Sequence, residues 1–190
     1  MLQPIFCTPV YSDKIDNFNK IQEELLHCVS NNIEFEYKKG WDETHFISDS
    51  TFNNDCIGQY NLINFYDELK VHLKKYCSSI GYNLNNYKIA SSWFSLFNQG
   101  NYGHLHSHGF SDIAGVYYLK TNGNDGNLYF ETPNPFLDSS ICYRELSNTV
   151  VYKPSEGELL LFPGWLKHGI SKNTTDNERV SLSFNIVVDR

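Results

Sequence analysis

Arg179-Val180-Ser181-Leu182-Ser183-Phe184-Asn185-Ile186-Val187-Val188, near the end of the 190-residue chain, alternates between polar and apolar side chains. Successive side chains of a β-strand point to opposite faces, so every second residue from Val180 to Val188 shares one apolar face. We expect other elements to cover this face. The opposite face either meets water, as in a half-buried antiparallel sheet, or lines the inside of a barrel, where Arg179 would hold a carboxylate through paired, charge-assisted hydrogen bonds.

Several further strands are predicted before this one. Short apolar or alternating runs occur at about 88–98, 104–108, 113–120, 127–131, 149–153 and 157–162. A set of seven or eight strands removes its exposed edges by closing upon itself as a jelly roll. The sequence therefore predicts a mainly β fold with a jelly-roll barrel.

Two helices are predicted ahead of the barrel. Apolar residues recur every three or four positions over residues 15–29, with Ser12 or Asp13 as the N-cap. A second pattern of this kind covers residues 62–80 and stops at Gly81, where a left-handed C-cap is expected. We expect both helices to pack on one outer face of the barrel.

The length fits one domain, residues 1–190. Residues 1–87 form a helical and irregular part in this interpretation, and residues 88–190 form the barrel that it supports. The predicted class is α+β with most of the regular structure in strands.

Composition and charge exclude several classes of partner. The chain has 15 Lys and Arg against 22 Asp and Glu, a net charge of −7, so it lacks the basic field that non-specific nucleic-acid binding requires. No run of 18 apolar residues is present, so no membrane partner is expected. Five scattered cysteines and a first segment without a signal-peptide pattern predict reduced thiols and a cytoplasmic location.

Three of the seven histidines lie close together, at His104, His106 and His108. Alternate residues of an extended segment share a face, so these imidazoles are expected to point the same way. A divalent metal is the commonest reason for neighbouring histidines, because it holds neutral imidazoles together. The alternative without a metal is that these histidines lie on a polar strand at the surface.

A third ligand has to come from elsewhere in the chain, and His168 is the candidate. It follows the apolar run 157–162 through a turn, 60 residues after His108. Four or five short strands fit into that interval and would return the chain to the opposite side of the same pocket. Arg179 lies eleven residues after His168, which places it on the neighbouring strand, within reach of a small ligand on the metal.

These residues resemble the iron(II)- and 2-oxoglutarate-dependent oxygenases. That superfamily uses a His-X-(Asp/Glu) pair, a distal His and an Arg about ten residues later, often in Arg-X-Ser. This chain has His106-X-His108, His168 and Arg179-X-Ser181. A subgroup with a His-X-His stretch that runs into Ser-Gly-X-Tyr-Tyr, found in bacteria and phages and similar to prolyl hydroxylases, matches best, with Ala114-Gly115-Val116-Tyr117-Tyr118 at that place.

The resemblance implies a double-stranded β-helix and an enzyme that hydroxylates its substrate with release of succinate and carbon dioxide. The cofactors would be iron(II), 2-oxoglutarate as a small-molecule co-substrate, and dioxygen. His106, His108 and His168 would hold the metal, and Arg179 and Ser181, together with Tyr118, would bind the far carboxylate of 2-oxoglutarate. His106, His108, His168 and Arg179 are therefore the candidate catalytic residues.

One departure concerns the carboxylate ligand of the superfamily, which His108 replaces. Either the site holds iron through three histidines, or Asp112, four residues after His108, supplies the carboxylate. We prefer the three histidines. His104 has the parity of a ligand too, although a role beside the metal or in solvent suits it better.

Two other functions fit the same residues. The spacing of Gly100, His106, His108, Asp112 and His168 nearly matches the cupin pattern, which would give a metalloenzyme of the same barrel that does not use 2-oxoglutarate. A non-catalytic jelly-roll binding module is the third interpretation. The Arg-X-Ser pair favours the oxygenase, because a cupin has no required role for it.

The primary substrate is not determined by the sequence. A peptide side chain, a nucleobase and a free metabolite all remain open. The physiological metal is undecided, and so is the choice between a monomer and a homodimer.

Overall fold

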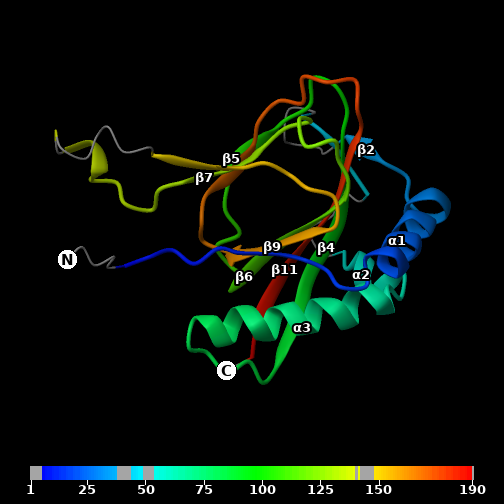
Figure 1. Cartoon of the computed structure of the whole chain (residues 1–190), viewed down its shortest axis with the longest axis horizontal. Coiled ribbons are helices and arrows are strands. Elements are labelled where there is room, and N and C mark those ends of the chain that lie inside the picture. The colour runs from blue at the N-terminus through cyan, green and yellow to red at the C-terminus, as the bar shows by residue number, and fades with distance from the viewer. Residues whose placement is uncertain (1–5, 38–43, 49–53, 140, 142–147, 190) are drawn as a thin grey trace.

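The computed structural model describes residues 6–37, 44–48, 54–139, 141 and 148–189, and it contains two antiparallel sheets with helices on one side (Figure 1). The larger sheet has the order β1-β9-β6-β11-β4-β3-β2. Its strands are β1 (Tyr11–Lys14), β2 (Glu36–Tyr37), β3 (Phe46–Ile47), β4 (Tyr87–Phe97), β6 (Ile113–Lys120), β9 (Glu158–Pro163) and β11 (Arg179–Val188).

The smaller sheet has the order β5-β10-β7-β8. Its strands are β5 (Gly103–His106), β7 (Leu128–Glu131), β8 (Thr149–Tyr152) and β10 (His168–Ile170). The helices are α1 (Phe18–Asn32), the short α2 (Cys56–Gln59) and α3 (Ile63–Ser79), and a 3-10 turn covers Leu137–Ser139. The seven predicted runs correspond to β4 to β9 and β11, whereas β1, β2, β3 and β10 were not among them. The two sheets form the predicted jelly roll.

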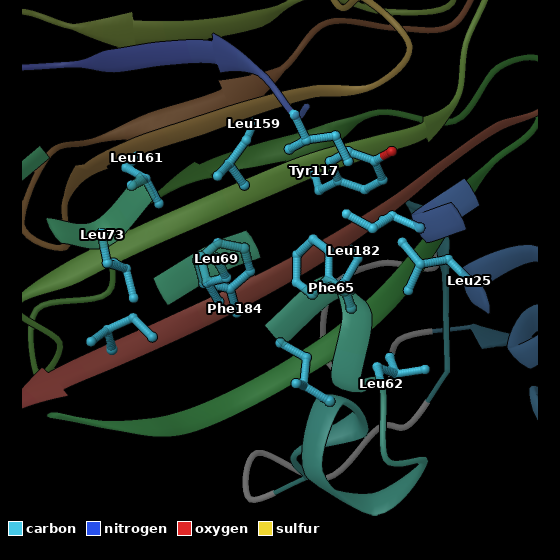
Figure 2. Close-up of a cluster of buried hydrophobic side chains, with 14 of the residues drawn as sticks. Leu25, Leu62, Phe65, Leu69, Leu73, Tyr117, Leu159, Leu161, Leu182 and Phe184 are labelled. Atoms are coloured by element: carbon cyan, nitrogen blue, oxygen red, sulfur yellow. The ribbon is translucent and has the colours of Figure 1, made fainter. Parts of the chain in front are cut away.

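The two faces of the larger sheet are used differently. On the outer face, Leu182 and Phe184 of β11 pack with Phe65 and Leu69 of α3, in an apolar cluster that also includes Tyr117 (Figure 2). The ring centroids of Phe65 and Phe184 are 6.1 Å apart. This arrangement confirms that helices cover the apolar face of β11.

The inner face of the larger sheet looks toward the smaller sheet. A second apolar cluster lies there and joins Val116, Tyr118 and Leu160 to Leu128 and Phe130 of β7. The polar face of β11 is also turned inward, because Arg179 and Ser181 are 0% and 1% exposed. Of the two alternatives for this face, the interior of the barrel is therefore correct and contact with water is wrong.

The start of the first helix differs from the prediction. Ser12 and Asp13 do not cap it, because they lie in β1, whose backbone is antiparallel to β9 with Asp13 opposite Leu159. The helix begins at Phe18 after Asn17. The backbone of these residues pairs with β9 along the edge of the sheet, so they extend the barrel and do not cap the helix. The second helix ends as predicted, at a Gly81 with φ of +77°.

The N-terminal part is more than a support for the barrel. β1 forms one edge of the larger sheet, and β3 pairs with β4 toward the other edge. The short α2 also contacts β4. Within the described ranges, no helix is both long enough and apolar enough to cross a membrane.

Candidate metal centre

Three imidazoles meet at one end of the smaller sheet. His106 ends β5 and His168 begins β10, and the two residues are directly opposite each other in the antiparallel pair. His108 lies in the turn after β5, where its backbone N–H donates to the carbonyl oxygen of Gly164 at 2.7 Å. The strand is thus shorter than the predicted run 104–108. One ring nitrogen from each of the three residues lies within 4.8 Å of the other two.

Backbone hydrogen bonds set the orientation of two of these rings. Nδ1 of His106 is 2.7 Å from the carbonyl oxygen of His104, and Nδ1 of His168 is 2.9 Å from that of Leu166. A carbonyl oxygen only accepts, so each Nδ1 carries the proton. In the neutral ring this leaves the Nε2 lone pair for a metal ion, and such a bond to the far nitrogen is typical of ligating histidines.

The surroundings of His168 favour its neutral form. The side chain is buried, with its ring centroid 4.8 Å from that of Phe162. Burial, together with the nearby charge of His106, lowers the pKa of His168 to about 4, against the opposing effect of the hydrogen bond to Leu166. A ring that is neutral at pH 7 keeps the lone pair that coordination requires.

The two other candidates for the metal shell lie apart from this cluster. The Asp112 carboxylate accepts a hydrogen bond from the backbone N–H of Val188 at 2.8 Å. The ring of His104 stands edge-on to Tyr102, with ring centroids 5.2 Å apart. Among the described residues, the group with metal-ligand spacing consists of His106, His108 and His168, without a carboxylate.

A cavity between the sheets connects the histidines with Arg179. Its wall includes all three histidines, Arg179 and the serines of the inner face of β4 and β11, namely Ser95, Ser181 and Ser183. Trp93 also lines it and lies near the metal side, with its ring centroid 5.9 Å from that of His108. Trp93 is opposite Ser183 in the sheet, whereas Phe97 is opposite Arg179, so the two ends of the cavity are four residues apart along each strand.

The Arg179 guanidinium is enclosed but only partly bonded. It lies 5.2 Å from the ring centroid of Phe97 and 4.9 Å from that of Tyr118, and Nη1 donates to the carbonyl oxygen of Gly126 at 2.8 Å. Nε and Nη2 have no hydrogen-bond partner in the described part of the chain. Buried donors without a partner are costly, and two of them on one guanidinium match the two oxygens of a carboxylate.

Tyr118 and Ser181 are directly opposite each other on β6 and β11. The Tyr118 hydroxyl is buried and has no partner among the described residues, and burial raises its pKa to about 12 although the charge of Arg179 opposes this shift. The hydroxyl is therefore a neutral donor at pH 7. Tyr118 packs against Arg179 and is not part of the cavity wall, whereas Ser181 is.

His45 is a further wall residue, and no sequence motif includes it. It is 6% exposed, lines the cavity and stacks on Phe97 with ring centroids 4.6 Å apart. Thr44 Oγ1 lies 2.9 Å from its Nδ1. No spacing in the sequence connects His45 with the histidine cluster, because its position depends on the pairing of β3 with β4.

Comparison with protein families gives one match, which covers half of the chain. A family model with the description "Putative 2OG-Fe(II) oxygenase" matches residues 91–185, which are 95 of the 190 residues and include every site residue described above except His45. A comparison with curated proteins gives no match.

Solved structures of low sequence identity share the fold. A Pseudomonas putida prolyl-4-hydroxylase has a TM-score of 0.61 at 14% identity, with 96% of this chain and 94% of that chain covered. HygX from Streptomyces hygroscopicus, with nickel, 2-oxoglutarate and hygromycin B bound, has a TM-score of 0.68 at 11% identity, covering 95% and 83%. The α-ketoglutarate-dependent epimerase SnoN from nogalamycin biosynthesis has a TM-score of 0.70 at 10% identity, covering 95% and 79%. The fold is thus the double-stranded β-helix of these oxygenases.

Proposed function

The chain belongs to the 2OG-Fe(II) oxygenase family, and from that premise we propose that His106, His108 and His168 hold the catalytic iron(II) while Arg179 anchors 2-oxoglutarate. The protein is an oxidoreductase that depends on iron(II) and 2-oxoglutarate. The cupin alternative without 2-oxoglutarate and the non-catalytic module are both set aside by this membership.

The donor set suits iron(II). Three neutral imidazoles on one side of the ion leave its other positions to exogenous ligands, as in the open sites of non-haem iron oxygenases. The hydrogen bonds from Nδ1 to backbone carbonyls support this assignment for His106 and His168, because they direct Nε2 toward the shared point. Asp112 is not needed as a ligand, since its carboxylate already binds the backbone of Val188.

The unpartnered donors around Arg179 carry the assignment of 2-oxoglutarate. Arg179 Nε and Nη2 and the Tyr118 hydroxyl are all buried and lack partners in the described chain. These donors would hold the far carboxylate, with Ser181 beside them on the cavity wall. Trp93 lies beside His108, and Arg179 lies at the opposite end of the cavity. The keto-acid end of the bound ligand would therefore point toward the histidines.

When bound, iron(II) and 2-oxoglutarate supply the oxidising chemistry, in which dioxygen is consumed and succinate and carbon dioxide are released. The residues of this chain fix the orientation of the keto acid and keep His168 neutral. The inner faces of the two sheets enclose the cavity in apolar side chains such as Phe162 and Leu128, which limits the access of water. We expect the net reaction to be hydroxylation of a C–H bond.

An anaerobic titration tests this assignment. Purified protein is loaded with iron(II), and 2-oxoglutarate is added while the visible charge-transfer absorption of the chelated keto acid is recorded. The band should form in the wild type, and Arg179→Ala should require at least about 100-fold more 2-oxoglutarate, since it loses two charge-assisted hydrogen bonds. Lys120→Ala, which removes an exposed cation paired with Glu178, is the matched control and should change nothing.

The metal content of the variants separates the two halves of the proposal. His168→Ala should lose bound iron, whereas Arg179→Ala should retain it. Loss of iron from both variants would contradict the division of roles, and iron retained by His168→Ala would remove that residue from the metal shell.

The primary substrate is the part of the proposal that concerns the mouth of the site. The substrate is a peptide side chain, a nucleobase or a metabolite, and the exposed Phe110 and Trp165, each close in sequence to a histidine of the cluster, would contact its apolar part. A cytoplasmic location and the choice between monomer and homodimer rest on the sequence alone. Mass analysis of the purified chain in solution decides the oligomeric state.

A further inference from the structure

The Arg179 side chain is a buried charge that forms no ion pair with a carboxylate of the described residues. It is 0% exposed, and within the described ranges its hydrogen bond goes to the Gly126 carbonyl oxygen. A buried charge without compensation destabilises the fold strongly. Some other group must therefore supply negative potential while leaving Nε and Nη2 accessible.

Asp125 is a carboxylate of this kind. It is also 0% exposed, and three neutral donors surround it. Thr121 Oγ1 donates to Oδ1 at 2.6 Å, and the Asn122 backbone N–H and Asn177 Nδ2 both donate to Oδ2 at 2.8 Å. These three hydrogen bonds offset part of the cost of burying the carboxylate.

Asp125 lies next to the groups that hold Arg179. Gly126, the following residue, provides the carbonyl oxygen that Arg179 Nη1 binds. Its φ of +104°, with Ser171 O only 2.6 Å from where a Cβ would lie, requires glycine. Asn177, which binds Asp125, is two residues before Arg179. The Asp125 carboxylate thus joins the loop after β6 to the segment that enters β11.

The two charges interact without touching. Burial lowers the pKa of Arg179, and the nearby Tyr118 and Asp125 oppose this shift. In a low-dielectric interior, such an interaction remains effective beyond hydrogen-bond distance. Asp125 and Arg179 form no direct ion pair, so Nε and Nη2 of the guanidinium stay without a partner among the described residues.

We propose that Asp125 is an offset counter-charge that stabilises the buried Arg179 guanidinium, the group that binds 2-oxoglutarate, without contacting it. It stabilises the charged guanidinium before the co-substrate binds and leaves Nε and Nη2 for the far carboxylate of that co-substrate. This inference rests on the proposed function in its second half only, since the pairing of the two charges is a property of the chain alone. Asp125 is a positioning residue, because it acts through Arg179.

A double-mutant cycle on thermal unfolding tests the pairing of charges. Asp125→Asn keeps the shape of the side chain and removes its charge, and it should lower Tm by about 5 °C, because Arg179 is then a buried cation without compensation. The same substitution in an Arg179→Met background should lower Tm by less than half as much. Equal losses in both backgrounds would show that Asp125 only anchors its loop and would overturn the proposal.

Binding of 2-oxoglutarate to the iron(II)-loaded, anaerobic protein gives a readout that a purely structural role would not predict. In Asp125→Asn the ligand carboxylate becomes the main negative charge near Arg179, so its Kd should fall roughly threefold to tenfold. A weaker or unchanged affinity contradicts the inference. The matched control Thr121→Val removes the two hydrogen bonds of the Thr121 hydroxyl, to Asp125 and from the Gly123 backbone N–H, but neither charge. It should therefore lower Tm equally in both Arg179 backgrounds and leave the Kd within about twofold.

The two measurements separate the inference from the proposed function. If the wild type binds no 2-oxoglutarate while the cycle shows coupling, the proposed function fails and the charge pair stands. If the wild type binds 2-oxoglutarate and the cycle shows no coupling, the Asp125 inference fails alone.

Discussion

The two faces of the seven-stranded sheet differ in how completely their groups are satisfied. On the outer face, apolar side chains of β6, β9 and β11 pack against α3 with aromatic contacts such as Phe65 to Tyr117, at a ring-centroid distance of 5.4 Å. On the inner face, buried donors of Arg179 and Tyr118 have no partner in the described chain. The outer face supplies stability, whereas the inner face keeps hydrogen-bonding capacity for a ligand. This division predicts that mutations on the two faces affect different measurements.

The largest effect is expected on the outer face. Phe184→Ala should lower the free energy of unfolding by about 3–5 kcal/mol, because Phe184 is 1% exposed and its removal leaves a cavity beneath α3. Iron and 2-oxoglutarate binding should persist below the new Tm. Chemical denaturation measures the change, and Ser183→Ala on the inner face of the same strand is the control, with an expected loss below about 1 kcal/mol. A similar loss for both variants would contradict the division.

Low pH should lower the stability of the fold through protonation of Glu68 in α3, on the outer face of the larger sheet. Its carboxylate binds Asn17 Nδ2 at 3.1 Å, the Asp16 backbone N–H at 3.3 Å and His72 Nε2 at 3.3 Å. Burial raises the pKa of Glu68, but the hydrogen bonds from Asn17, Asp16 and His72 outweigh burial and hold the pKa below its usual value. A lowered pKa in the folded state gives stability that is present above the unfolded pKa and is lost as pH falls through the folded pKa.

Glu68→Gln tests this pH dependence. It should lower the free energy of unfolding by about 1–3 kcal/mol at pH 7 and make the profile flatter below about pH 4.3. Unfolding measured from pH 3 to 7 checks the shape. An acid limb as steep as that of the wild type would mean that other carboxylates, such as Asp13, cause the acid sensitivity.

On the inner face we expect a smaller effect, in which the affinity for 2-oxoglutarate falls although the stability does not. Tyr118→Phe removes the unpartnered hydroxyl and keeps the ring that packs on Arg179. The affinity for 2-oxoglutarate should fall by a factor of about 2–10, equivalent to one hydrogen bond, whereas Tm should stay equal or rise. Binding and unfolding are measured on the same sample. Unchanged affinity would restrict Tyr118 to a packing role against the guanidinium.

The smallest effect concerns Asp112, which the sequence left as an alternative metal ligand. Asp112→Ala should leave the iron content of the purified protein unchanged, because the carboxylate binds the backbone of Val188 instead of the histidine cluster. Metal analysis beside His108→Ala, which should lose iron, gives the comparison. Loss of iron from the Asp112 variant would return a carboxylate to the metal shell.

Much of the barrel could be predicted because strand alternation is a local property. The run 113–120 was predicted with the same bounds that β6 has, and the strand at 179–188 coincides with β11. The start of the first helix was wrong, because the choice between an N-cap at Ser12 and an edge strand depends on the distant β9. The histidine cluster was predictable from its spacing and from its resemblance to an oxygenase family.

The surroundings of Arg179 could not be predicted in the same way. His45, Asp125 and Gly126 come from segments far from it in sequence, and none of them stands in a motif with a fixed spacing. Their relation to Arg179 depends on which strands pair and how the loops between them close.

The sequence by itself determined the kinds of group at the site and the two-faced pattern of the strand that carries Arg179, since side-chain chemistry and alternation are local. Only the tertiary structure decided that the polar face of β11 is turned inward and that His106, His108 and His168 share one point. It alone placed Asp125 beside Arg179 without a direct contact. The physical reason is that burial and long-range electrostatics depend on which distant segments are packed together, and sequence spacing does not record this.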